Sequence, residues 1–486
     1  MEEPLEALML ALLLLAAVLV SSVIDQLVPK ISSPLIQILL GLGIALLASS
    51  QIKIELDDKL FLVLFIAPLL YDEAKNIDKA SLWRNRKPVL SLAIGLVVVT
   101  ALIIGFAVEW LEPSIGLFAA FALGAALGPT DAVAVASLSK ETDIAPRDKS
   151  ILEGESLIND ASGIVAFQFA LAAATTGTFS LLNASLDFVV SFFGGIAIGL
   201  ALGYLGNFLV RRVRSWGLEN TTFHVLFEVF TPFIVYLVAN QLGTSGIIAV
   251  VAAGLVNVIS PRTIGPSISR MNIVSSSVWR VLSFALNGIV FVFLGTQLPK
   301  AMQGTWDDVS IDNGVLIGYI LLLTLIYVAV RFVWLLAMER YHSHRSPKGQ
   351  RPGWRADVRS SLVMALGGPK GTITLAVVLT IPVTYLDPLR GVVAFPQREL
   401  IIFLACGVIV VTLLLATFVV PLLAPRKPPT DEDLRCDETQ VSLEILRAVI
   451  EELAARQTPE NRAATQTVIH SYNQRIARIK NSNDIL

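Results

Sequence analysis

Apolar segments of membrane-crossing length, separated by polar loops, follow one another as far as residue 424. A helix needs about 20 mostly apolar residues to cross the hydrocarbon core of a bilayer. Because the N-terminus is acidic rather than basic, the first segment is interpreted as a membrane helix and not as a cleaved signal peptide. The pattern predicts an all-α polytopic membrane protein with about thirteen transmembrane helices, at residues 5–24, 34–50, 57–72, 88–110, 115–138, 151–176, 186–209, 222–241, 245–260, 279–298, 314–338, 360–383 and 399–423.

The pattern changes after residue 424, where prolines at 425, 428 and 429 lead into a polar segment. Two helical patterns follow, one over 441–456 and one that starts at Thr458-Pro459-Glu460, where an N-cap precedes a proline at the first helical position. We therefore expect a transmembrane domain at 1–424 and a short cytoplasmic helical tail at 425–486. Regulation, assembly and simple solubilisation are all compatible with such a tail.

Two of the expected helices carry helix-breaking residues in the middle of the membrane. Leu127-Gly128-Pro129-Thr130-Asp131 interrupts the fifth helix, and Leu366-Gly367-Gly368-Pro369-Lys370-Gly371 interrupts the twelfth. Proline removes an amide donor and clashes with the preceding turn. The two helices are an odd number of spans apart, so they run in opposite directions. This fits an inverted repeat, in which discontinuous helices cross near the midplane and frame a binding site.

The charges at these breaks are expected to matter. Freed amides at a helix N-terminus are partly positive and freed carbonyls at a C-terminus partly negative, so Asp131 and Lys370 can neutralise opposite helix ends. We predict dipole compensation for Lys370. For Asp131 we favour membership of an ion site.

Composition and charge agree with a membrane transporter. Apolar residues make up 54% of the chain, and a net charge of −2 gives no cation excess for a nucleic-acid surface. Under the positive-inside rule the alternate loops that are rich in Lys and Arg are cytoplasmic, which places the N-terminus outside and the C-terminus inside. These loops hold Lys75, Lys79, Arg84, Arg86 and Lys87, then Lys140, Arg147 and Lys149, then Arg211, Arg212 and Arg214, then Arg262 and Arg270, and then Arg345, Lys348, Arg351 and Arg355.

Acidic residues lie inside apolar sequence between positions 131 and 160, and an ionisable group in a membrane segment is a functional-site hypothesis by default. On a helix, Glu155 lies over Asn159, and Ser156 lies over Asp160 on the adjoining stripe. Carboxylate, amide and hydroxyl oxygens suit a small alkali cation and not a transition metal. The four histidines, His224, His342, His344 and His470, are expected to be solvated and to hold no metal.

Arg331 lies well inside the eleventh span and remains charged, so it requires an anionic partner. Glu155 and Glu153 are the candidates. If Arg331 keeps one glutamate ionised, Asp160 is the carboxylate left for either a cation or a proton, because burial disfavours its ionised form. Competition between Na⁺ and a proton for Asp160 is then a complete exchange mechanism that needs no cofactor.

The chain resembles the sodium/proton exchangers of the first monovalent cation:proton antiporter family, in particular the prokaryotic NhaP type with thirteen helices. GPTD at 128–131 and GESLIND at 154–160, at this spacing and together with Arg331, make the resemblance specific. Other matching segments are Pro68-Leu69-Leu70-Tyr71-Asp72, Thr231-Pro232-Phe233, Gly243-Thr244-Ser245-Gly246, Phe293-Leu294-Gly295, Gln297-Leu298-Pro299, and Gly367-Gly368 with Lys370-Gly371.

The resemblance implies roles for individual residues. It implies that Asp160 binds the ion and the proton, assisted by Asp131, the Thr130 backbone, Ser156 and Asn159, with Na⁺ at Asp160 and Asp131. It implies a structural bridge between Glu155 and Arg331, a homodimer in the cell membrane, and electroneutral exchange, because Asn159 stands where electrogenic relatives carry an aspartate. The third-helix motif reads Asp72-Glu73 here, so either acid is a candidate for the ion funnel, and Asn240 replaces a glutamate that many members have.

The same residues also allow three other functions to be compared with sodium/proton exchange. A potassium/proton exchanger uses the same oxygen ligands, and the sequence does not choose among Na⁺, Li⁺ and K⁺. A cation channel or a sensor is less compatible with two opposed broken helices and a single acidic cluster. An intramembrane aspartyl protease could form a dyad from Asp131 and Asp160, but it gives no place to Arg331 or to the repeat.

Overall fold

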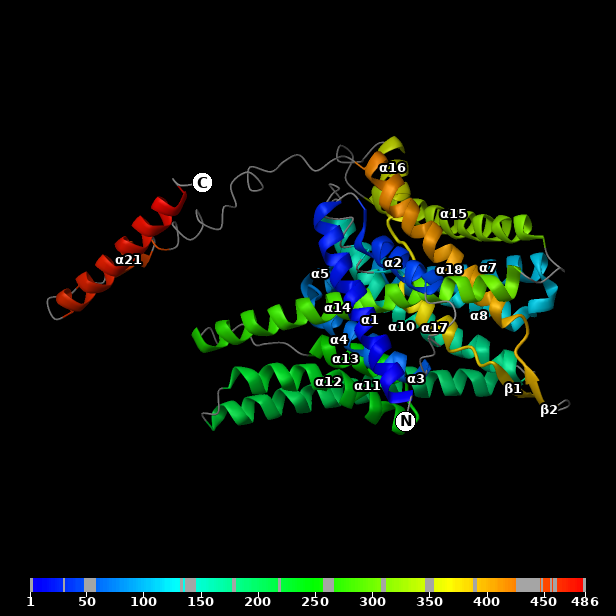
Figure 1. Cartoon of the computed structure of the whole chain (residues 1–486), viewed down its shortest axis with the longest axis horizontal. Coiled ribbons are helices and arrows are strands. Elements are labelled where there is room, and N and C mark those ends of the chain that lie inside the picture. Colours follow the sequence, from blue (N-terminus) through cyan, green and yellow to red (C-terminus); the bar gives the residue numbers. More distant parts are fainter. Residues whose placement is uncertain are drawn as a thin grey trace. The chain divides into compact units, whose positions relative to one another are not determined.

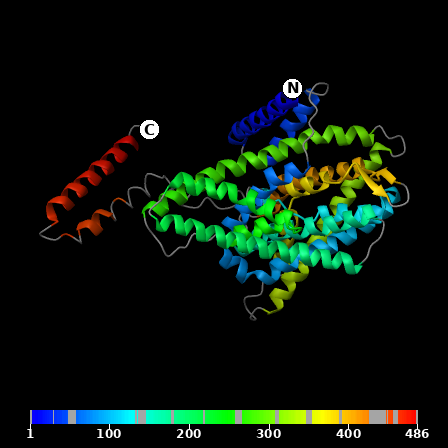
Figure 2. The same cartoon turned by 90° about the horizontal axis from the view of Figure 1, so that it is seen from below.

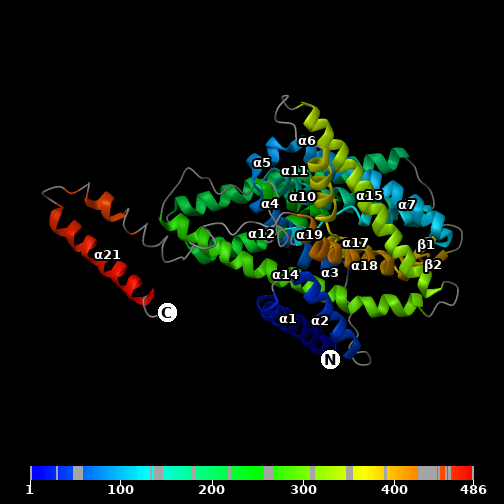
Figure 3. The same cartoon turned by 90° about the horizontal axis from the view of Figure 1, so that it is seen from above.

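The computed structural model describes residues 3–28, 31–47, 58–131, 134–135, 146–176, 181–216, 220–256, 266–306, 312–345, 354–387, 391–424, 446, 449–454, 457 and 461–483. The chain separates into two compact units, Met1–Pro425 and Arg426–Leu486. Each unit is considered by itself. Figures 1, 2 and 3 show the elements from three directions.

Helices make up nearly all of the described part of the first unit. Its N-terminal half contains α1 (Glu3–Leu27), α2 (Ser33–Leu47), α3 (Asp58–Phe61), η1 (Leu62–Ile66), α4 (Ala67–Asn76), α5 (Lys79–Arg84), α6 (Arg86–Leu90), η2 (Ser91–Leu96), α7 (Val97–Leu111), η3 (Pro113–Ile115), α8 (Leu117–Ala126), α10 (Pro146–Thr176) and α11 (Leu181–Ser215). Helices α3, η1 and α4 are continuous, as are α6, η2 and α7. The η1 and η2 segments are π-helical turns within these longer helices.

The remaining part of the first unit contains α12 (Thr221–Gln241), α13 (Gly246–Val256), α14 (Pro266–Trp306), α15 (Asn313–Arg345), α16 (Trp354–Leu366), α17 (Thr372–Leu379), α18 (Arg398–Leu414), η4 (Leu415–Val419) and α19 (Val420–Leu423). Strands β1 (Thr384–Asp387) and β2 (Gly391–Ala394) pair antiparallel, with Thr384 opposite Ala394. The sequence analysis did not predict this hairpin.

Each of the thirteen expected spans coincides with described helical residues, and the all-α architecture with interrupted fifth and twelfth helices is confirmed. Among the described residues, seven helices are long and apolar enough to cross a membrane, and four shorter apolar helices accompany them. The number of crossings therefore stays a prediction. Parts of the spans expected at 34–50, 57–72, 115–138 and 245–260 lie outside the described residues.

Small residues let the helices approach closely. Helix α2 packs along α14, as Figures 1 and 3 show. A Cβ atom on Gly295 would collide with the backbone oxygen of Ile38, and one on Gly41 would collide with that of Val292. In membranes, where lipid tails are as apolar as side chains, such close backbone packing is a main source of helix association.

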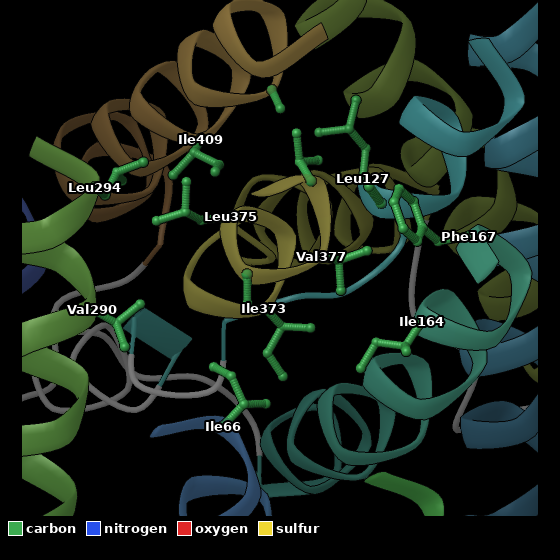
Figure 4. Packing of buried hydrophobic residues seen from close by; sticks show 14 of the residues in the cluster. Ile66, Leu127, Ile164, Phe167, Val290, Leu294, Ile373, Leu375, Val377 and Ile409 are labelled. Carbon is green, nitrogen blue, oxygen red and sulfur yellow. The ribbon is translucent and has the colours of Figure 1, made fainter. Parts of the chain in front are cut away.

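The short helix α17 lies in the middle of the apolar core. Figure 4 shows its side chains directed at different neighbours, with Ile373 toward Ile66 and Val377 toward Phe167. All four residues are at most 9% exposed. Because α17 is covered on every side by other helices, the polar residues at its N-terminus are enclosed by protein.

The second unit contains α21 (Arg462–Asn483) and a helical stretch at 449–454. Helix α21 lies within the stretch in which a helix was expected from residue 458 onward, and residues 458–460 lie outside the described residues, as do most of residues 441–456. The assignment of residues 425–486 as a cytoplasmic tail stays a prediction.

Candidate ion-binding site

The two helix breaks meet each other. Helix α8 ends at Ala126 and α16 at Leu366, and the residues that follow them, 127–131 and 367–371, are not helical. The backbone amide of Asp131 donates to the carbonyl oxygen of Pro369 at 2.9 Å. Each break therefore satisfies backbone groups of the other, as non-helical backbone at membrane depth requires.

Lys370 binds the carbonyl end of α8. Its Nζ atom donates to the oxygens of Gly128 and Pro129 at 2.8 and 2.7 Å, and it lies 4.1 Å from the ring centroid of Tyr327 on α15. Its backbone amide donates to Thr412 of α18 at 3.0 Å. A cation on free carbonyls at a helix C-terminus is the favourable arrangement for the helix dipole.

Asp131 occupies the opposite kind of site. Its Oδ1 accepts from the amide of Ala134 at 2.9 Å, and its Oδ2 accepts from the amide of Thr372, the first residue of α17, at 3.2 Å. A Cβ atom on Gly371 would collide with the carboxylate of Asp131, so only glycine leaves room for it. Asp131 therefore caps the start of α17 and also binds the amide of Ala134, a structural role beside the ion contact expected from the sequence.

A polar face of α10 lies against Thr130. Ser156 donates to the carbonyl oxygen of Thr130 at 2.7 Å, and the Asn159 amide nitrogen donates to the Thr130 hydroxyl at 2.7 Å. The three residues are at most 4% exposed. A Cβ atom on Gly163, three residues after Asp160, would approach Pro129 to 2.5 Å, so α10 is pressed against the break. The face predicted from helical spacing is thus directed at the broken helix.

Arg331 of α15 pairs with Glu155. Its Nη2 lies 2.8 Å from Oε2, and its Nη1 contacts Oε1, so the guanidinium binds the carboxylate with both nitrogens. Both side chains are 1% exposed. Gly368 makes room for the guanidinium, because a Cβ atom there would lie 2.7 Å from Cζ. The alternative partner Glu153 is wrong, since its side chain is 45% exposed and lies 3.8 Å from Lys149.

Asp160 is 2% exposed, and its Oδ1 has no hydrogen-bond partner among the described residues. The charged groups that act on it are Glu73, Asp131, Lys370 and Glu155. A carboxylate oxygen held away from water and lipid needs a cation or a proton. Because Asp131 is bound by amides and Glu155 by Arg331, the acids of this group with an oxygen left open among the described residues are Asp160 and Glu73, and Asp160 is the one on the helix face that contacts the break.

Glu73 and Asp72 of α4 face different surroundings. Glu73 acts electrostatically on Asp131 and Asp160, and its Oε2 is buried without a hydrogen bond within the described part of the chain. Asp72 instead accepts hydrogen bonds from Ser283 of α14 at 2.6 Å and from Asn76 at 2.7 Å. Of the two candidates, Glu73 is the acid whose charge acts on both Asp131 and Asp160.

The sequence analysis missed one buried polar cluster. Lys75 was interpreted only as a topology signal, yet it lies 2.9 Å from Glu228 of α12, which is 2% exposed. His224 was expected to be solvated, and this was wrong: it is 7% exposed and lies 3.4 Å from Glu228. A glutamate within the apolar run of α12 was the available signal. The side chains of His342 and His344 lie outside the described set, and His470 is exposed.

Comparison with known proteins agrees with this geometry. The model of the family described as "Sodium/hydrogen exchanger, transmembrane" matches residues 9–425. The chain belongs to this family. It is accordingly a transmembrane transporter of the exchanger class and not a member of an enzyme family.

Two relatives are named sodium, potassium, lithium and rubidium/H⁺ antiporters. The one from Bacillus pumilus is 39% identical over 98% of this chain and 70% of its own length. The one from Bacillus subtilis is 37% identical over 97% of this chain and 69% of its own length. The solved structure of the sodium proton antiporter MjNhaP1 from Methanocaldococcus jannaschii aligns with a TM-score of 0.61, at 19% identity, over 86% of this chain and 98% of that one. The last likeness shows a shared exchanger fold.

Proposed function

We propose that this exchanger moves a monovalent cation, Na⁺ first among them, against a proton, and that both compete for Asp160. The observation that carries the proposal is the buried, open Oδ1 of Asp160 at the crossing of two broken helices. Membership of the sodium/hydrogen exchanger family supports the reaction. The names of the two Bacillus relatives extend the range of cations to test to K⁺, Li⁺ and Rb⁺.

The remaining site residues have supporting roles in this proposal. Asp160 and Asp131 hold Na⁺, with oxygens of Thr130, Ser156 and Asn159 beside them, and Glu73 attracts the cation toward the site. Oxygen ligands of this kind suit hard cations. Ser156 and Asn159 are both hydrogen-bonded to Thr130, so a bound ion takes over oxygens that these hydrogen bonds already orient.

The charge balance of the site favours one cation for one proton. Arg331 neutralises Glu155, Asn159 carries no charge, and Lys370 is bound to carbonyl oxygens. In this proposal Asp131 and Glu73 keep the same charge throughout the cycle and only Asp160 changes between its cation-bound and its protonated form, so each exchange cycle carries no net charge. The ions are substrates, and the proposal includes no resident cofactor.

The proposal also includes an orientation and an assembly. The Lys- and Arg-rich alternate loops support an N-terminus outside the cell membrane and a cytoplasmic C-terminus. A homodimer follows from the resemblance of the chain to dimeric exchangers.

Exchange in proteoliposomes tests the function. A sodium gradient should drive proton movement measured by a pH-sensitive dye, and Li⁺ and K⁺ are tested in turn. Asp160→Asn should abolish the signal, whereas Glu153→Gln, on the same helix but exposed, should leave it intact. An imposed voltage should leave the rate unchanged. Full exchange by Asp160→Asn, or a rate that follows the voltage, would remove the corresponding part of the proposal.

A further inference from the structure

A buried cluster on the far side of α4 joins three helices. Lys75 of α4 lies 2.9 Å from Oε2 of Glu228 on α12, and it donates to Ser275 of α14 at 3.3 Å. Ser275 in turn donates to the same Oε2. The Lys75 ammonium also lies 5.5 Å from the ring centroid of Trp279. Taking an ion pair out of water carries a large desolvation penalty. A pair buried inside a membrane helix bundle is therefore a candidate for a functional role.

The cluster is linked to the ion site through α4. Glu73, which acts on Asp131 and Asp160, precedes Lys75 by two residues, and residues two apart on a helix do not share a face. One face of α4 thus carries the acid that acts on the ion site, and another carries the cation bound to α12 and α14. Because both residues lie on α4, a change in the contacts of Lys75 with α12 and α14 also acts on Glu73.

His224 adds a titratable group to this cluster. Its Nε2 lies 3.4 Å from Oε1 of Glu228, one turn further along α12. With Nε2 directed at Glu228, Nδ1 is the atom left to take up a proton, and it makes no hydrogen bond within the described part of the chain. Histidine is the side chain that ordinarily changes charge between about pH 5 and 8.

Among the described residues, His224 contacts Glu228 of its own helix, and Glu228 binds Lys75 of α4 and the uncharged Ser275 of α14. Asp72 of α4 acts electrostatically with Lys75 and Glu228, and Arg280 of α14 is exposed. The elements α13 and η1, which also pack on α12, contain no titratable side chain. The cations Arg211 and Arg212 at the end of α11 are exposed, and Arg212 stacks on Trp216. The cluster is neutral when His224 is neutral and carries one positive charge when His224 is protonated.

We propose that His224 is a proton-responsive positioning residue that sets the acid limit of exchange separately from Asp160. Protonated His224 competes with Lys75 for the Glu228 carboxylate. The ion pair between Lys75 of α4 and Glu228 of α12 is then weaker, and α4 is bound less tightly to α12 and α14. The added positive charge beside the Glu73-bearing helix also repels the entering cation. Both effects lower the cation affinity in acid, beyond the loss that proton competition at Asp160 already produces.

The test compares pH profiles of the sodium concentration that gives half-maximal exchange. His224→Gln should match the wild type in alkaline solution and should need roughly threefold to tenfold less Na⁺ than the wild type near pH 5, because one repelling charge is absent. His224→Arg, which stays charged in alkaline solution, should show the weak acid-like affinity there as well. His470→Gln, on the exposed face of α21, is the matched control and should follow the wild type.

The same comparison is repeated in the Glu228→Gln variant, in which His224 has lost its carboxylate partner. There, His224→Gln should cause a smaller shift than in the wild type, because the effect through the Glu228 carboxylate is absent and only the direct repulsion of the entering cation remains. If His224→Gln does not fold, His224→Asn carries the same comparison. A profile of His224→Gln that superimposes on the wild type, or an equal shift in both backgrounds, would overturn the inference.

This inference rests on the proposed exchange, and the two fail differently. A wild-type protein that moves no protons at any pH contradicts the proposed function. A wild-type protein that exchanges, together with a His224→Gln variant of identical pH profile, contradicts only the role of His224.

Discussion

Replacing Arg331 by alanine removes one half of the buried ion pair with Glu155. Both side chains are 1% exposed, and the guanidinium binds both carboxylate oxygens, so the variant leaves an ionised glutamate without its cation. Breaking such a pair destabilises a protein by about 3 to 5 kcal/mol. With an unfolding entropy of about 2.1 cal/mol/K per residue over about 420 residues, this lowers the melting temperature by roughly 3 to 6 °C.

The assay is thermal unfolding of purified protein in detergent, followed by intrinsic fluorescence. The double variant Arg331→Met with Glu155→Leu removes both charges and should recover most of the loss, because the penalty comes from the unpaired charge and not from the missing bridge. Lys149→Ala is the control on α10, where the pair with Glu153 is nearly half exposed and should contribute less than about 0.5 kcal/mol. The reasoning is refuted if Arg331→Ala melts at the wild-type temperature, or if the double variant Arg331→Met with Glu155→Leu melts at a lower temperature than Arg331→Ala.

Two further predictions concern the site. Glu73→Gln should raise the sodium concentration for half-maximal exchange by roughly tenfold while exchange persists, because a charge that attracts the cation is lost. Asp72→Asn, whose native carboxylate is bound to Ser283 and Asn76, should change it far less, and equal effects in sodium titrations would contradict this assignment. Gly371→Ala should eliminate exchange, because its methyl group displaces the Asp131 carboxylate from the start of α17. Near-normal transport by this variant would show that Asp131 need not occupy this position.

The helix breaks could be predicted from the sequence because their cause is local. Gly128-Pro129 and Gly367-Gly368-Pro369 interrupt helical hydrogen bonding wherever they occur in a membrane helix. The requirement of Arg331 for an anionic partner could likewise be predicted, because the residue lies inside an apolar segment. The choice between Glu153 and Glu155 was open because helical spacing does not show which face of α10 is turned toward Arg331 of α15.

The Lys75–Glu228 cluster could not be assembled from the sequence in the same way. Its two partners are 153 residues apart, and the loop position of Lys75 already had an explanation in membrane topology. His224 was interpreted as exposed because it lies one turn from the start of α12. Long-range packing of α4 and α14 against α12 buries it, and no periodicity within α12 reports that packing.

The most direct test of the central claim is to count the protons released when Na⁺ binds to purified protein in weakly buffered detergent solution. Competition at Asp160 predicts release of about one proton per bound Na⁺ at a pH where the site is protonated, and no release from Asp160→Asn. Sodium binding to the wild type without proton release, or unchanged release from Asp160→Asn, would contradict the account.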